Sequence, residues 1–175
     1  DSDVLECCAE ASKTGPVEAV NFNSPGQVVI AGEKKALAKA IELVKAKGCR
    51  RAIELAVSGP FHSSMLKPAG EKLAARLAEV ALSVPEIPVI ANVDVKTLAN
   101  PAEIRTVLAE QVSSPVQWVK TIQKMATDGV TDIVECGPGK VLQGLIRRIA
   151  PEIRIYGISD AATLAAALEK LKAAQ

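Results

Sequence analysis

Aromatic side chains are scarce in this sequence: two phenylalanines, one tryptophan and one tyrosine make up 2% of its 175 residues. Proteins that bind single-stranded nucleic acids stack bases on such side chains. A surplus of positive charge is missing as well, because 21 Lys and Arg are balanced by 20 Asp and Glu. We therefore expect no nucleic-acid partner.

Apolar runs long enough to span a membrane are also absent, and the N-terminal stretch DSDVLECC has neither the basic start nor the apolar core of a signal peptide. The cysteines show no metal-binding spacing, since two are adjacent and none form a CxxC pair: Cys7, Cys8, Cys49 and Cys136. We expect a cytoplasmic chain with reduced thiols, no metal and no membrane partner. The surroundings of Cys49 and Cys136 are apolar or strand-like, which predicts buried, inert thiols.

The first 57 residues follow the order helix, strand, strand, helix, strand. Helices are predicted over 3–13 and 33–47, and strands over 17–23, 27–32 and 51–57. The turn residues NSPG at 23–26 predict a hairpin between the first two strands. This order matches a ferredoxin-like βαββαβ unit without its first strand. A smaller three-stranded variant and a chain that begins inside the unit both stay open.

After residue 58 strands alternate with helices, which predicts an α/β layer with parallel strands. The predicted strands are 87–93, 131–137 and 154–159, and the predicted helices are 66–82, 101–111, 116–127, 140–149 and 161–172. The first of these strands, IPVIANV, has no polar alternation, which is typical of a buried parallel sheet. Two architectures therefore meet near residue 57.

The only histidine, His62, lies in the stretch SGPFHSSM at 58–65. It follows the carboxyl end of a predicted strand, where α/β folds place functional side chains, and a general base needs a nucleophile within reach. Ser63 and Ser64 precede a predicted helix and are expected to be N-caps, and the nucleophile-elbow pattern GxSxG does not occur. Within these residues the histidine has no serine to activate, and a structural or merely exposed histidine is the alternative.

Three other stretches carry polar or glycine residues that could serve a site. In NFNSPGQ, Asn21 and Asn23 are two apart, so their side chains point the same way if the strand continues; turn-forming asparagines are the alternative. CGPGK at 136–140 could expose amides to an anion at a helix N-terminus, but a structural turn is favoured. Gln111 ends a predicted helix with a free backbone carbonyl.

Taken together, four stretches resemble bacterial malonyl-CoA:acyl carrier protein transacylases in order and spacing across essentially the whole chain. They are AVNFNSPGQVVIAG (19–32), AVSGPFHSSML (56–66), SSPVQW (113–118) and VECGPGKVLQGL (134–145). The resemblance implies an α/β-hydrolase-like large subdomain interrupted by a ferredoxin-like small one. The expected fold class is α/β, with residues 1–57 as the small subdomain lacking its first strand and 58–175 as the C-terminal part of the large one.

The same resemblance implies the chemistry. In this family malonyl-CoA acylates a serine, coenzyme A leaves, and the pantetheine thiol of acyl carrier protein takes the malonyl group for fatty acid synthesis, with no further cofactor. His62 is then the general base, and the backbone carbonyl of Gln111 orients it. Asn21 and Asn23 correspond to asparagines that face the active-site cleft, and Phe61 resembles the signature of malonyl-selective enzymes.

Several residues of the family have no counterpart in this sequence. The serine of the GHS-type elbow, the arginine that binds the substrate carboxylate and the oxyanion-hole glutamine all precede the small subdomain in the family. The chain therefore looks like the C-terminal part of the enzyme and is expected to need an N-terminal part as its partner. The 175 residues alone are expected not to transfer malonyl groups.

Acyl carrier protein is the second expected partner, and because it is strongly acidic, a basic patch is expected to steer its docking. One basic cluster comprises Lys45, Lys47, Arg50 and Arg51, and another comprises Lys140, Arg147 and Arg148. Two other functions stay open. They are an acyltransferase domain of a polyketide synthase and a non-catalytic module that only binds the carrier protein.

Overall fold

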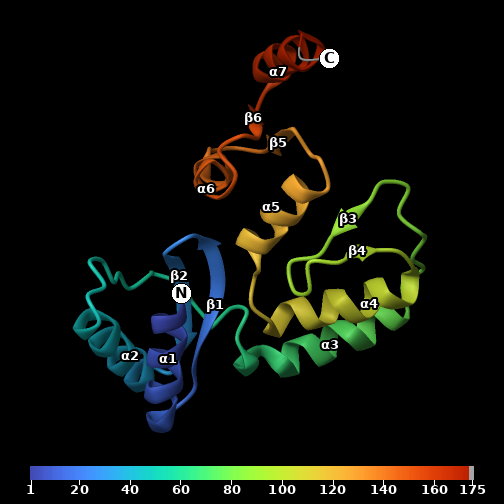
Figure 1. The fold of residues 1–175 in the computed structure, drawn as a ribbon. Coiled ribbons are helices and arrows are strands. Elements are labelled where there is room, and N and C mark those ends of the chain that lie inside the picture. The colour runs from blue at the N-terminus through green and yellow to red at the C-terminus, as the bar shows by residue number, and fades with distance from the viewer. Residues whose placement is uncertain (174–175) are drawn as a thin grey trace. The chain divides into compact units, whose positions relative to one another are not determined.

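The computed structural model describes residues 1–173 and divides into two compact units, Asp1–Trp118 and Val119–Gln175 (Figure 1). Helices and strands occur together in both units, so the fold belongs to the predicted α/β class. The subdomain boundary expected at 57/58 rests on the family resemblance and stays a prediction. No helix of the described part is both long and apolar enough to cross a membrane.

The first unit opens with two helices packed on a hairpin, as predicted. These elements are α1 (Ser2–Ala11), β1 (Val17–Ser24), β2 (Gln27–Gly32) and α2 (Lys34–Ala46). β1 and β2 pair antiparallel, which confirms the hairpin, and Gly26 in its turn has a φ of 72°. α1 and α2 lie side by side against it (Figure 1). Small side chains allow this close packing, and the buried cluster comprises Cys8, Ala11, Val17, Ala36 and Ala40.

The strand predicted over 51–57 is wrong, because these residues adopt no regular secondary structure. The apolar alternation is present, but Ile53, Leu55 and Val57 are 56%, 53% and 63% exposed. A strand needs a neighbour that completes its backbone hydrogen bonds, and no segment within residues 1–173 pairs with this stretch. The apolar alternation of 51–57 therefore indicates a face that is suited to burial, although the described residues do not bury it.

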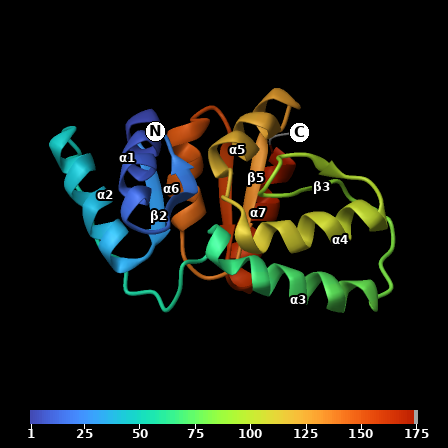
Figure 2. The same ribbon diagram turned by 90° about the horizontal axis from the view of Figure 1, so that it is seen from below.

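Helices α3 (Lys67–Ala78) and α4 (Pro101–Glu110) lie side by side in both views (Figures 1 and 2). The backbones come close at Gly70, where an added β-carbon would lie 3.0 Å from the carbonyl oxygen of Ala109. The side chain of Asn100 caps α4 by accepting the amide hydrogen of Glu103 at 2.9 Å. This pair positions the candidate site, because α3 follows the histidine loop and α4 ends at Gln111.

The buried parallel strand predicted over 87–93 is also wrong. The chain forms a short antiparallel hairpin there, from β3 (Val89–Ile90) and β4 (Thr97–Leu98). Ile87 is 77% exposed and Val89 is 47% exposed, so the apolar run is not enclosed between layers. A continuous apolar run identifies a segment suited to burial, but its pairing direction depends on the strands beside it.

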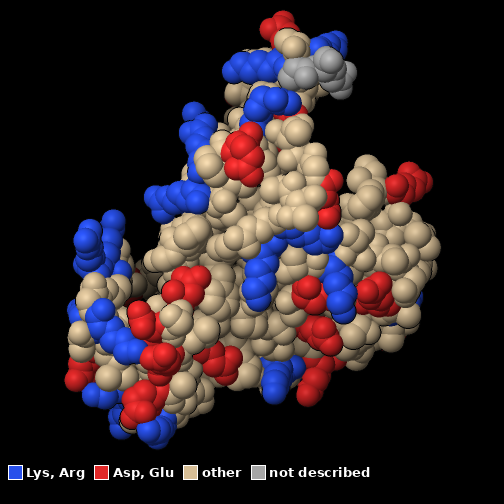
Figure 3. Space-filling model, viewed as in Figure 1, with Lys and Arg blue, Asp and Glu red and all other residues tan. Residues whose placement is uncertain are grey.

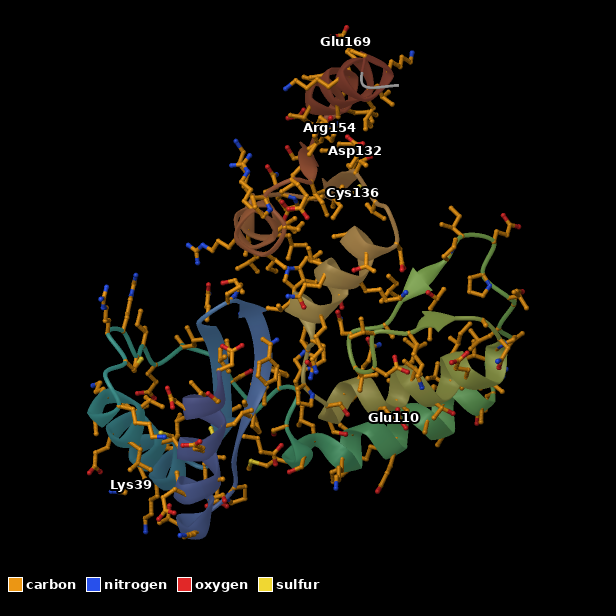
Figure 4. All side chains as sticks on the ribbon, in the orientation of Figure 1. Lys39, Glu110, Asp132, Cys136, Arg154 and Glu169 are labelled. Atoms are coloured by element: carbon orange, nitrogen blue, oxygen red, sulfur yellow. The ribbon has the colours of Figure 1, made fainter. Side chains whose placement is uncertain are left out.

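The second unit contains the parallel pair that the sequence predicts. Its elements are α5 (Trp118–Thr127), which starts at the last residue of the first unit, β5 (Asp132–Cys136), α6 (Val141–Ile149), β6 (Arg154–Ile158) and α7 (Ala161–Ala173). β5 and β6 are parallel and joined through α6, as a βαβ connection requires. Asp132 accepts two hydrogen bonds from Arg154, at 2.6 and 2.7 Å (Figure 4), and these bonds, with one from Thr131, hold the pKa of Asp132 at about 2.

Candidate active site

His62 lies in a tight loop between the irregular stretch 51–57 and α3. Its backbone φ is 63°, in the left-handed region that non-glycine residues seldom adopt, although histidine does so more often than most. Such strained residues concentrate at functional sites, where the surrounding structure holds them in place. The ring is half-buried.

The ring nitrogen Nδ1 of His62 lies 3.0 Å from the backbone carbonyl oxygen of Gln111. A carbonyl oxygen can only accept, so Nδ1 carries the hydrogen and donates it. In the neutral ring Nε2 then keeps a free lone pair, the form that a general base needs. The geometry therefore fixes both the orientation and the tautomer of the imidazole. The catalytic roles of His62 and Gln111 stay predictions.

Gln111 is itself held by its side chain. It is the C-terminal cap of α4, and its Oε1 accepts the amide hydrogen of Asn92 at 2.9 Å. The carbonyl of Asn92 accepts in turn from the amide of Gln117, also at 2.9 Å. The carbonyl that orients His62 thus belongs to a bonded framework, and Asn92 is a member of it that sequence reasoning missed.

The two serines after His62 do not cap a helix in the predicted way. Ser63 occupies the cap position of a short 3₁₀ turn, but its hydroxyl donates backwards to the carbonyl of Pro60 at 2.7 Å. Ser64 donates both its hydroxyl and its backbone amide, the latter at 3.0 Å, to the carboxylate of Glu18. The capping prediction is wrong because neither hydroxyl oxygen accepts an amide hydrogen of the following helical turns; both hydroxyls donate, to Pro60 and to Glu18. Glu18, which is 46 positions away from Ser64, gave no signal in the sequence.

Asn21 and Asn23 lie on β1 next to two register shifts, between Ala19 and Asn21 and between Phe22 and Ser24. Bulges of this kind redirect side chains, so simple alternation does not decide whether the two amides point the same way. Asn21 also forms a parallel bridge with Val116. The binding roles of Asn21, Asn23 and Phe61 stay predictions.

The CGPGK stretch forms a turn in front of α6. Gly137 and Gly139 have φ values of 129° and 99°, which favour glycine. The carboxylate of Glu135 accepts the amide hydrogens of Leu142 and Gln143, at 3.0 and 3.3 Å. The first turn of α6 thus bonds an anion of the protein itself, which favours the structural alternative over an external anion site.

The burial of the cysteines differs from the prediction. Cys49 and Cys136 are exposed rather than buried. Cys7 and Cys8 are buried in α1. Burial, with smaller contributions from Cys7 and Glu18, raises the pKa of the Cys8 thiol to about 11, so this thiol stays protonated and unreactive.

The two basic clusters differ in their acidic neighbours. In the first, Lys47 pairs with Asp3 and Glu6 of α1, and the bond to Glu6 is the main cause of a raised lysine pKa. In the second, Lys140 and Arg147 have no acidic partner among residues 1–173. Lys and Arg side chains project over α6 (Figure 3). A groove of about 300 Å³ is lined by Lys140 and Arg147 and lies between α6, β6 and α7.

Comparisons with known proteins place the chain in a family. The chain matches the acyl transferase domain family over residues 4–167, and it belongs to that family. It is 47% identical to the malonyl CoA-acyl carrier protein transacylase of Haemophilus influenzae, over 96% of this chain and 54% of that protein. Against the protein of the same name from Escherichia coli K12 it is 46% identical, over 97% of this chain and 55% of that one.

Solved structures agree with these relatives. The acyl-carrier-protein S-malonyltransferase of Burkholderia pseudomallei superposes with a TM-score of 0.94 at 51% identity, over 97% of this chain and 55% of that chain. A malonyl-transacylase in complex with its type II PKS acyl-carrier protein gives the same TM-score at 42% identity and the same coverage. The chain thus spans about half the length of the relatives it matches.

Proposed function

We propose that this chain is the C-terminal part of an acyltransferase that moves a malonyl group from malonyl-CoA to the phosphopantetheine thiol of acyl carrier protein, in cytoplasmic fatty acid synthesis. Relatives at 46–47% identity bear the name of that activity. The observation that carries the proposal is the bond from His62 Nδ1 to the Gln111 carbonyl at 3.0 Å, because it leaves Nε2 free to take a proton.

The reaction consists of two acyl transfers with one base. Nε2 of His62 takes the hydroxyl proton of a serine outside this chain, the serine oxygen attacks the thioester carbonyl of malonyl-CoA, and the carbon–sulfur bond breaks. The coenzyme A thiolate leaves with the proton from His62. His62 then takes the thiol proton of acyl carrier protein, and the sulfur attacks the carbonyl carbon of the acyl-serine. The carbon–oxygen bond to serine breaks, and the serine oxygen regains the proton from His62. Both carriers are substrates, and the scheme uses no further cofactor.

An N-terminal part of the same enzyme is the proposed first partner. It would supply the serine and cover the apolar face of 51–57, where Ile53, Leu55 and Val57 are more than half exposed. Pairing with it would give this stretch the strand partner that it lacks. In this proposal residues 1–57 form the ferredoxin-like small subdomain and 58–175 the C-terminal part of the α/β-hydrolase-like large one. Asn21, Asn23 and Phe61 line the substrate side of the cleft.

The proposal predicts that activity requires both parts. We define the completed enzyme as this chain fused to the N-terminal half of the Haemophilus influenzae relative. Purified, the 175 residues should transfer no malonyl group, because the nucleophile is absent, whereas the completed enzyme should load radiolabelled malonyl onto acyl carrier protein. Transfer by the 175 residues alone, or a completed enzyme that melts cooperatively but transfers nothing, would contradict the proposal. Loading with methylmalonyl instead would favour a polyketide-type acyltransferase.

Acyl carrier protein is the proposed second partner, docking on the cluster Lys140, Arg147 and Arg148. Reversing the charge with Arg147→Glu and Arg148→Glu should raise the KM for the acidic carrier roughly tenfold, while malonyl-CoA hydrolysis stays unchanged. The matched control is Arg50→Glu with Arg51→Glu, which changes the charge equally in the other cluster. Steady-state kinetics of the completed enzyme measures both. Equal effects of the two double variants, or an equal effect on hydrolysis, would exclude this docking surface.

A further inference from the structure

We propose that Glu18 is a positioning residue for His62, acting through Ser64; the inference rests on the proposed role of His62 as a base. The carboxylate of Glu18 accepts two hydrogen bonds from Ser64, one from the backbone amide at 3.0 Å and one from the hydroxyl. Ser64 is two residues after the histidine. The contact therefore ties the backbone of the His62 loop to β1.

The loop needs such a tie because its other bonds are local, apart from the bond of the His62 ring to the Gln111 carbonyl. The Ser63 hydroxyl and amide both donate to the carbonyl of Pro60, at 2.7 and 3.3 Å, and the amide of Leu66 donates to Ser63. These bonds give the loop its shape, but they do not place it against the rest of the unit. They would persist if the whole loop moved as one piece. The left-handed φ of His62 adds a strain that local bonds alone do not relieve.

Backbone hydrogen bonds connect the segment that carries Glu18 to the segment that carries Gln111, so the two residues hold fixed positions relative to each other. β1 carries Glu18, and it exchanges two backbone bonds with Val116: the Phe22 amide donates to the Val116 carbonyl and the Val116 amide to the Val20 carbonyl, each at 2.9 Å. Val116 follows Gln111 by five residues. The framework therefore holds the imidazole through the Gln111 carbonyl and the loop backbone through the Glu18 carboxylate.

A carboxylate is suited to this task. It accepts two hydrogen bonds at once, and bonds to a charged acceptor are stronger than neutral ones. Glutamine at the same place offers one carbonyl oxygen, and alanine offers none. From glutamate through glutamine to alanine at position 18, the hydrogen bonding to Ser64 therefore weakens stepwise, while β1 keeps its backbone pairing.

The single histidine of the chain allows a direct test, because every imidazole signal comes from His62. In ¹⁵N-labelled chain at about pH 8.5, well above the reference range for histidine, the wild type should show one tautomer with hydrogen on Nδ1. Glu18→Ala should give a mixture of tautomers, with Glu18→Gln and Ser64→Ala intermediate. The control, Glu86→Ala, removes an exposed glutamate of the same unit that has no bonded partner among the described residues, and it should keep the wild-type signal.

The completed enzyme provides the second measurement. Glu18→Ala should lower kcat about 10- to 100-fold with the KM for malonyl-CoA nearly unchanged, because the base is displaced while substrate binding is intact. An unchanged tautomer and an unchanged kcat in Glu18→Ala would overturn the inference. If that variant fails to fold, wild-type behaviour of both Glu18→Gln and Ser64→Ala overturns it instead. A fully active His62→Asn variant would overturn the proposed function, so the two failures are distinguishable.

Discussion

Replacing His62 with asparagine is expected to reduce malonyl transfer by the completed enzyme about 1,000-fold, the scale of a lost general base. Asparagine tolerates the left-handed backbone that His62 adopts at φ 63°, so the loop should keep its shape. The amide cannot accept a proton from serine or from the carrier thiol. The loss should therefore appear in both half-reactions, in acylation by malonyl-CoA and in transfer to the carrier protein.

The control for this variant is Met65→Ala, three residues further along the same loop, where the side chain is 38% exposed and has no role in the proposed chemistry. It should keep wild-type kinetics. Melting curves of both variants should overlap with the wild type. If His62→Asn retains more than a tenth of the wild-type rate at an unchanged melting temperature, His62 is not the base.

Local features of the fold could be predicted from the sequence, and features that depend on a distant partner could not. The hairpin at Gly26 and the parallel pair β5–β6 follow from turn chemistry and from a short crossover, and both are confirmed. The strands expected over 51–57 and 87–93 are wrong for a shared reason. Apolar alternation and apolar runs indicate that a segment is suited to burial. A strand forms only where a second segment completes its backbone hydrogen bonds.

The candidate site divides in the same way. His62 could be found because it is the only histidine of the sequence and follows the conformationally restricted Gly59-Pro60 step. Gln111 could be found because it ends a predicted helix with a free carbonyl. Their pairing follows from the family resemblance and not from spacing, because 49 residues separate them. Glu18 and Asn92 could not be found at all. Each acts on a residue that is distant in the chain, and neither stands in a motif.

Replacing Gly32 with alanine is expected to lower the free energy of unfolding of the first unit by about 3 kcal/mol. Gly32 is paired with Val17 where the hairpin strands end. An ideal β-carbon at Gly32 would lie 2.5 Å from the Val17 Cα and closer still to the carbonyl oxygen of Pro16. Both are backbone atoms, so no side-chain rotation relieves the clash and β1 must move.

The measurement is urea unfolding followed by circular dichroism, with Gly59→Ala as the matched control. At Gly59 an ideal β-carbon would meet only the Phe61 ring, at 3.9 Å, so the free energy should stay within about 0.5 kcal/mol of the wild type. β1 also carries Glu18, so its displacement should loosen the loop of His62, and Gly32→Ala should give the same mixture of imidazole tautomers as Glu18→Ala. A Gly32→Ala chain with wild-type stability would mean that the start of β1 has more room than the observed backbone allows. A destabilised chain that keeps the wild-type tautomer would show that the orientation of the His62 ring does not depend on the stability of the hairpin.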